Sequence, residues 1–77
     1  MTRSKLFSAI KEANQYLDSA KEARLAGNEE LATSKEDIAF LIIDDTIEPA
    51  WRAQHNTFSY QIKYSNRTGH YYAIIKD

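Results

Sequence analysis

The stretch FLIIDD, residues 40–45, decides the fold, because it is the most apolar run of the chain and ends in two adjacent carboxylates. A buried strand here would carry Asp44 and Asp45 to a phosphoryl or metal site at its carboxyl end. A helix would instead turn the apolar residues toward neighbouring elements and the acids toward water. The choice between strand and helix therefore determines whether an enzyme is considered at all.

Helical periodicity favours the second interpretation. At about 100° per residue, two apolar stripes run along opposite sides of a helix over 29–47: Leu31, Ile38, Leu41 and Ile42 on one side, and Phe40, Ile43 and Ile47 on the other. A helix that is apolar on two sides is expected to lie between two other elements. A phosphoacceptor strand would need further strands and crossover helices that the chain is too short to supply. An antiparallel strand over 38–44 remains the open alternative, since periodicity alone does not exclude it.

The first half of the chain predicts two helices. Apolar residues recur at spacings of three and four over 4–26, which is typical of an amphipathic helix, and Gly27 stands where a left-handed residue would end it. Asn28 is a suitable cap for a second helix, although the sequence SKED after Ala32-Thr33 offers a second start near residue 35. Pro49 disfavours helical geometry at the preceding residue, so we expect the second helix to stop near Ile47.

The C-terminal part predicts a β-hairpin over about 57–65 and 70–76. The segment TFSYQIKYS alternates strictly, and the NRTG that follows suits a tight turn. With Gly69 at a left-handed bulge position, Asn66 is expected to pair with His70. This register places Tyr64 opposite Tyr72 and Ile62 opposite Ile74. The face left for solvent then includes Gln61, Lys63, Tyr71 and Ile75.

The expected fold is a single α+β domain over 1–77, in which an antiparallel helical hairpin (about 4–26 and 29–47) precedes a C-terminal β-hairpin (about 57–65 and 70–76) packed on the second helix. Phe40 and Ile43 should face the β-hairpin, and Leu41 and Ile42 the first helix. Asp45 should lie near the amino end of the first helix, where free amides favour an acid, and Asp44 should face water. A chain of 77 residues buries only about 60 % of its surface, which allows one thin core.

Composition argues against catalysis and cofactors. The chain has no cysteine and only two glycines, so thiolate metal sites and a Gly-rich phosphate loop are excluded. His55 and His70 form no ligand pair of known spacing. No apolar run approaches the length of about 20 residues that a membrane span needs, and the first residues are too charged for a signal peptide. We expect a cytoplasmic protein that is not an enzyme and holds neither metal nor cofactor.

Charge is distributed unevenly around a formal net charge of −1. Residues 29–48 carry seven acidic side chains and one lysine, whereas both flanking segments are net basic. One interpretation is complementarity between neighbouring elements of the fold. The other is an acidic face offered to a basic partner, formed by Glu36, Asp37, Asp44 and Glu48.

The residues that the predicted core does not use suggest a binding surface. Tyrosine, tryptophan and arginine concentrate binding energy at interfaces, and the candidate partner-binding residues are Trp51, Arg52, Lys63, Arg67, His70 and Tyr71. We expect a small interaction protein that binds and regulates or inhibits a larger macromolecule, most simply a protein. By size alone, it is comparable to accessory proteins of phages and mobile elements.

Two further binding modes stay open. Single-stranded nucleic acid would bind through stacking on Tyr71 and through contacts of its phosphates with Lys63, Arg67, His70 and Lys76. The sequence supports this mode weakly, because it has no clear basic stripe. The outer edge of the β-hairpin would accept a strand from a partner or from a second copy, which predicts a homodimer through that edge.

Overall fold

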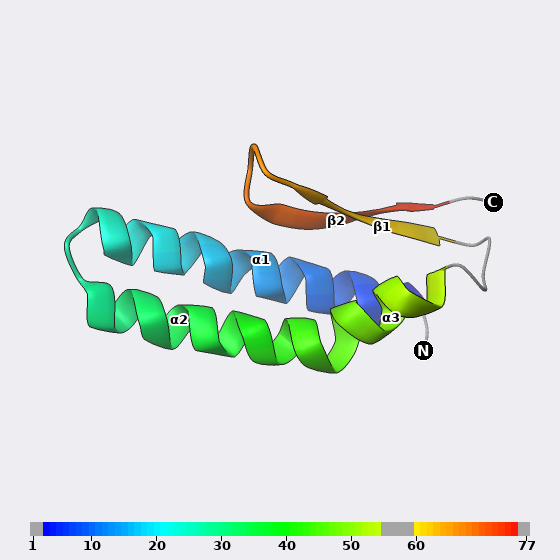
Figure 1. The fold of residues 1–77 in the computed structure, drawn as a ribbon, viewed down its shortest axis with the longest axis horizontal. Helices are drawn as coiled ribbons and strands as arrows, with labels where there is room; N and C mark the ends of the chain where they lie inside the picture. The colour runs from blue at the N-terminus through cyan, green and yellow to red at the C-terminus, as the bar shows by residue number, and fades with distance from the viewer. Residues whose placement is uncertain (1–2, 55–59, 76–77) are drawn as a thin grey trace.

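The computed structural model describes residues 3–54 and 60–75, and its elements follow the predicted order of two helices and a hairpin (Figure 1). The helical elements are α1 (Arg3–Leu25), α2 (Glu29–Ile42), the π-helix η1 (Ile43–Ile47) and α3 (Glu48–Ala53). The strands β1 (Tyr60–Ser65) and β2 (His70–Ile75) form a two-stranded antiparallel sheet. The α+β class and the antiparallel helical hairpin are confirmed. The predictions for His55, Lys76 and the strand residues 57–59 lie outside the described residues.

The turn between α1 and α2 follows the sequence signals. Gly27 has a φ of +82°, and its N–H donates to the Arg24 carbonyl while the Asn28 N–H donates to the Ala23 carbonyl. This pair of bonds satisfies the last carbonyls of α1. The Asn28 side chain then accepts from the Leu31 N–H at 3.1 Å, which fixes the start of α2 at Glu29 rather than near residue 35.

Small residues form the contact between α1 and α2. Ala13 and Ala20 of α1, and Ala32 and Ala39 of α2, are almost completely buried. Since an alanine side chain is one methyl group, its complete burial requires the helix axes to approach closely. The large residues of FLIIDD therefore find little room between the helices.

The observed positions of the FLIIDD residues differ in part from the expected sandwich. Leu41 is 69 % exposed and lies at the rim of the α1–α2 contact, and Phe40 is 48 % exposed, so the predicted packing of these two side chains is wrong. Ile42 and Ile43 are partly buried against the core, as expected. Asp44 faces water as predicted, and Asp45 lines a shallow groove with residues of the N-terminal part of α1. Its described hydrogen bond comes from the Thr46 hydroxyl at 3.4 Å, so its anchoring to helix amides stays a prediction.

The helical backbone does not end before Pro49. Glu48 has φ −65° and ψ −44°, and its N–H donates to the Ile43 carbonyl, five residues earlier. In a regular α-helix the Pro49 ring would crowd the carbonyl of residue 45, and the wider turn of η1 relieves this crowding. The helix consequently changes direction instead of stopping, and α3 turns toward the sheet (Figure 1). The expectation that proline terminates the helical backbone near Ile47 is therefore wrong.

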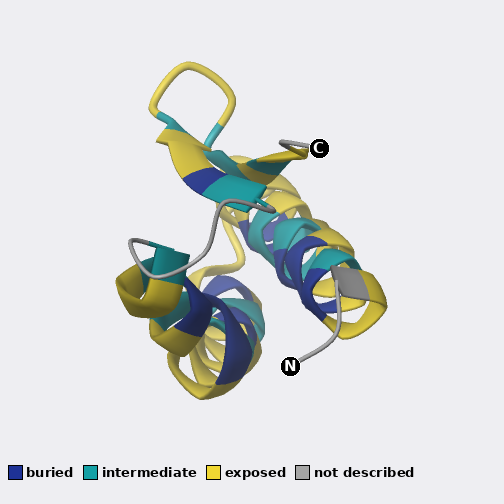
Figure 2. Ribbon diagram, turned by 90° about the vertical axis from the view of Figure 1, so that its right-hand side faces the viewer, coloured by how far each residue is buried: buried dark blue, intermediate teal, exposed yellow. Residues whose placement is uncertain are grey.

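The hairpin rests on two helical elements. It contacts the second helical segment as predicted, but at the C-terminal end of that segment through α3, and β2 also contacts α1. Seen along the helices, α1, the α2–α3 segment and the sheet form a triangle whose buried surfaces face its centre (Figure 2). The buried core cluster consists of Leu6, Ala9, Ile10, Ala13, Ile47, Ala50 and Ile62.

The strand register is shifted by one residue from the predicted one. Gly69 has the expected positive φ, +73°, but its N–H donates to the Ser65 carbonyl at 2.8 Å. The loop therefore has four residues, and Ser65 pairs with His70. Because side chains alternate along a strand, a shift of one residue exchanges the two faces of β2. Tyr71 thus shares the inner face with Tyr64, and the expectation that Tyr71 and Ile75 face outward is wrong.

Side-chain amides occupy both edges of the sheet. Asn14 of α1 donates to the Tyr71 carbonyl at 2.9 Å and accepts from the Tyr71 N–H at 3.0 Å. On the other edge, the Gln54 side-chain oxygen accepts from the Ile62 N–H at 2.7 Å. These amides take positions that a neighbouring strand would need. They limit the addition of a further strand, including the homodimer expected through the hairpin edge.

The first prediction concerns Asn14. Replacement by alanine leaves the Tyr71 N–H and carbonyl without these bonds in a half-buried position, so Asn14→Ala should lower the free energy of unfolding by about 1–3 kcal/mol. Urea denaturation followed by circular dichroism measures it. Gln15→Ala removes a similar amide from the exposed neighbouring position and should change the free energy by less than about 0.5 kcal/mol. Equal effects of the two substitutions would contradict the bridging role of Asn14.

The second prediction tests the alanine contact. Ala39→Leu inserts three carbon atoms where the helices meet and should destabilise the fold by about 1–3 kcal/mol. Leu41→Ala should cost less than about 1 kcal/mol, because most of that side chain is exposed. Chemical denaturation of both variants gives the comparison. A loss of about 2–5 kcal/mol for Leu41→Ala, typical of a buried leucine, would instead support the sandwich that the sequence predicts.

Candidate functional site

A groove opens where η1, α3 and the hairpin meet. It has a volume of about 420 Å³ and is lined by Ile43, Ile47, Glu48, Trp51, Arg52, Tyr64 and Tyr71; we call it the Trp51 groove. Trp51 meets Tyr71 edge-to-face with ring centroids 6.0 Å apart and an interplanar angle of 89°. Tyr64 lies 4.9 Å from Tyr71, tilted by 60°. The three rings therefore form one continuous aromatic cluster along the groove.

Each ring is positioned by a different part of the fold. The register places Tyr64 directly opposite Tyr71, and Asn14 holds the backbone of Tyr71 against α1. Trp51 is brought to the hairpin by α3, whose direction follows from η1 and Pro49. A hydrogen bond of 3.3 Å from the Tyr60 hydroxyl to the Ala50 carbonyl joins β1 to α3. The groove therefore lies between elements that are themselves fixed by hydrogen bonds.

The described lining of the groove contains one acidic and one basic side chain, Glu48 and Arg52. Glu48 lies on its wall and accepts from Arg52 at 2.6 Å, an i,i+4 ion pair whose arginine is largely exposed. Burial raises the pKa of the Tyr71 phenol above its ordinary value, and Tyr64, Glu48 and Asp44 raise this pKa further. Of these neighbours, the two carboxylates disfavour an additional negative charge at neutral pH. The groove is thus unfavourable for an anion at the Tyr71 hydroxyl.

The structure brings together only half of the predicted partner-binding residues. Trp51, Arg52 and Tyr71 line the groove. By strand alternation, Lys63 lies on the opposite face of the sheet, paired with Tyr72. His70 Nε2 lies 2.6 Å from Asp18 Oδ1 of α1, so His70 serves to hold the tip of the hairpin on the helix.

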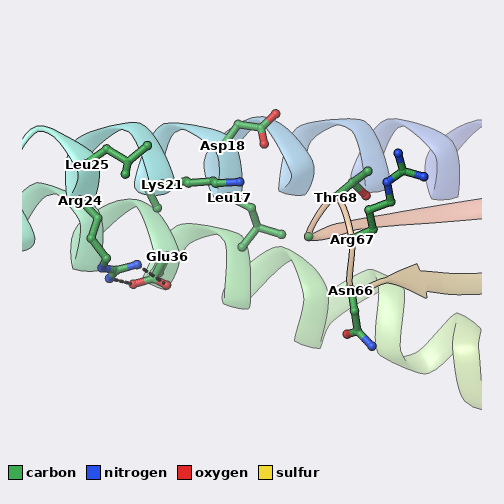
Figure 3. Close-up of a pocket in the computed structure, with 11 residues that line it drawn as sticks. Leu17, Asp18, Lys21, Arg24, Leu25, Glu36, Asn66, Arg67 and Thr68 are labelled. Atoms are coloured by element: carbon green, nitrogen blue, oxygen red, sulfur yellow. Dashed lines mark hydrogen bonds and ion pairs between the residues drawn. The ribbon is translucent and has the colours of Figure 1, made fainter.

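Arg67 belongs to a separate surface. It lies in the turn between the strands and lines a polar depression with α1 residues such as Lys21 (Figure 3). At the other end of the same depression, Arg24 and Glu36 face each other across α1 and α2 (Figure 3). Arg67 and the Trp51 groove therefore do not form one site.

The predicted acidic face is reduced in the structure. Glu36 accepts from Arg24 at 2.5 Å, and this bond holds the pKa of the Glu36 carboxyl below its usual range. Glu48 is paired with Arg52. Asp37 and Asp44 are exposed, and no described ion pair involves them. Part of the charge pattern thus serves complementarity within the fold, and an acidic face offered to a basic partner stays a prediction.

Sequence reasoning missed Tyr64 and Ile43 as parts of the site. The predicted register placed Tyr64 on the face of the hairpin that packs on the second helix, yet it is 44 % exposed at the groove. Ile43 was expected only to pack against the hairpin, and it also lines the groove. The signal that would have found Tyr64 is the loop length, because a four-residue NRTG loop pairs it with Tyr71.

The described part of the chain offers neither a metal-binding cluster nor a membrane-spanning helix. Over the described ranges 3–54 and 60–75, no three histidine or carboxylate side chains come together as a metal ion would require. None of the helices in this part of the chain has the length and apolar character of a membrane span.

Comparison of the chain with protein-family models, with curated proteins and with solved structures finds no match. The groove and its surroundings are thus the basis for a functional proposal.

The third prediction concerns the titration of Tyr71. Its raised pKa means that the folded state holds this proton more tightly than the unfolded state. The resulting stability is fully present below the unfolded pKa, about 10, and is lost as pH rises through the folded pKa. Tyr71→Phe should therefore reduce the loss of stability at alkaline pH in urea denaturation. Tyr72→Phe, which leaves Tyr71 in place, should retain that loss; the same pH profile for both variants would contradict the assignment.

Proposed function

We propose that the protein is a small, non-enzymatic binding module of the cytoplasm, which docks on a larger protein through the Trp51 groove and regulates or inhibits it. The observation that carries this proposal is the aromatic cluster of Trp51, Tyr64 and Tyr71, which stays open along the groove beside Ile43. A few residues supply most of the binding energy of a protein interface, and tryptophan, tyrosine and arginine are enriched among them. The three aromatic rings and the aliphatic side chain of Ile43 together form a surface that can receive a side chain of a partner protein.

The other features of the groove support binding rather than catalysis. Among the described residues, its lining contains neither histidine nor a serine or cysteine nucleophile, and its charged residues neutralise each other in the Glu48–Arg52 pair. A nucleophile and a base in hydrogen-bond contact are the usual mark of a catalytic site. The amides of Asn14 and Gln54 at the sheet edges favour docking through side chains over strand addition.

No observation favours the alternative of single-stranded nucleic-acid binding. That function requires aromatic rings next to cations that follow the phosphate backbone. Lys63 and Arg67 lie away from the Trp51 groove, and Arg52 is already paired with an acid. We therefore restrict the proposal to a protein partner.

The fourth prediction uses two tyrosines of equal exposure. Tyr64 and Tyr72 are both 44 % exposed, but Tyr64 lines the groove and Tyr72 lies on the outer face of the sheet. Tagged wild-type protein, Tyr64→Ala and Tyr72→Ala should be used to capture partners from cells that encode the protein, with quantitative mass spectrometry as the measurement. The partner retained by wild type should be reduced about tenfold or more with Tyr64→Ala, the loss expected of an interface hot spot, and unchanged with Tyr72→Ala.

Two results would contradict this assignment. Equal recovery by all three proteins would remove the groove from the interface, and a selective loss with Tyr72→Ala would move the interface to the outer face of the sheet. Circular dichroism and thermal unfolding of the purified variants verify that each is folded. A photo-reactive phenylalanine analogue at position 64, compared with one at position 72, then tests direct contact without truncating either side chain.

A further inference from the structure

The surroundings of the Trp51 groove indicate the charge of what it binds. Glu48 lies on the wall of the groove, and Asp44 lies one helical turn earlier and is exposed. Both carboxylates are close enough to Tyr71 to raise the pKa of its phenol. Two acidic side chains thus lie at or near the aromatic cluster.

Arg52, the one cation among the described residues of the lining, shows how a basic group is accommodated there. The Arg52 guanidinium lies 2.6 Å from a Glu48 carboxylate oxygen, although the Arg52 side chain is 77 % exposed and is therefore free to move aside at small cost. Lys35, the only basic residue over 29–48, lies at the Tyr16 ring, 5.6 Å from its centroid. The segment 29–48 therefore contributes no basic side chain to neutralise Asp44 and Glu48.

We infer that the Trp51 groove takes a lysine or arginine side chain from a basic segment of the partner protein. The aromatic faces of Trp51, Tyr64 and Tyr71 attract a cation electrostatically, and they remain favourable to the aliphatic part of the same side chain. Glu48 provides a carboxylate for its charged end. This inference rests on the proposed function, since it specifies the chemistry of the partner at the same groove.

The charge pattern disfavours the opposite choice of ligand. An acidic segment or a phosphate group would meet Glu48 and Asp44, and the only cation in the described lining is Arg52, which is already paired with Glu48. Like charges placed together across an interface oppose binding. A neutral apolar side chain would fit the rings but would leave the carboxylate unused.

The experiment uses three blocked pentapeptides that differ at one position: Ala-Leu-Lys-Leu-Ala and its counterparts with Gln or Glu in place of Lys. Trp51 is the single tryptophan of the chain, so its indole N–H gives one signal in a two-dimensional NMR spectrum and reports on the groove directly. We expect the lysine peptide to shift this signal at a concentration about fivefold or more below that of the glutamine peptide, and the glutamate peptide to bind most weakly.

A matched pair of charge variants tests the role of the carboxylate. Glu48→Gln should abolish most of the preference for lysine over glutamine, because it removes the groove carboxylate and releases Arg52. Glu30→Gln makes the same change of charge in the first turn of α2, outside the groove, and should retain the preference. Equal effects of the two variants would show that net charge, rather than the groove, selects the peptide.

The outcomes separate this inference from the proposed function. Equal binding of the three peptides, or tighter binding of the glutamine or glutamate peptide, would overturn the preference for a cation while the groove stays a binding site. No shift of the Trp51 signal with any peptide, in a folded protein, would overturn both. Shifts confined to signals of the outer sheet face would place binding elsewhere and would also overturn both.

Discussion

The placement of the hairpin depends on two hydrogen bonds between the Asn14 side chain and the backbone of Tyr71. A two-stranded hairpin is marginally stable by itself in water, and the Asn14 bonds act together with those of Gln54, Tyr60 and His70 to hold it on the helices. A primary amide that donates and accepts at one residue fixes both the position and the rotation of β2. The ring of Tyr71 consequently points toward Trp51, and the groove exists only while this arrangement holds.

The π-helix has a comparable effect on the other wall of the groove. One extra residue in a helical turn rotates every later side chain by about 100° relative to an uninterrupted α-helix. In this protein the extra residue precedes Pro49, so Thr46 and Ile47 are both buried and Trp51 is directed to the hairpin. The proline is therefore best understood as the cause of a bend that brings α3 to the sheet.

Local signals predicted most elements, and the exceptions have specific physical causes. Gly27, Asn28 and Gly69 each have the conformation or capping role expected from their residue types. The register was missed because a left-handed glycine suits both a three- and a four-residue loop, and one residue decides which face Tyr71 occupies. The packing of FLIIDD was predicted wrongly because the large apolar residues on each side of the helical wheel were assumed to be buried. Where two helices approach closely, the buried residues are instead small ones such as alanine. Residue type was enough to predict Trp51, Arg52 and Tyr71 as binding residues. That Tyr64 lies beside Tyr71 in the groove could be predicted only with the correct strand register.

The stability of the hairpin and the affinity of the groove are linked by this construction. Ile43, Trp51 and Tyr71 complete the core on one side and line the groove on the other. Rings held in place by the fold lose little side-chain freedom when a partner covers them, which reduces the entropic cost of binding. Any partner that covers Tyr64 and Tyr71 binds only the folded hairpin, and by mass action it stabilises that hairpin. In a domain with so thin a core, the open aromatic surface is therefore a part of the structure that a bound partner would reinforce.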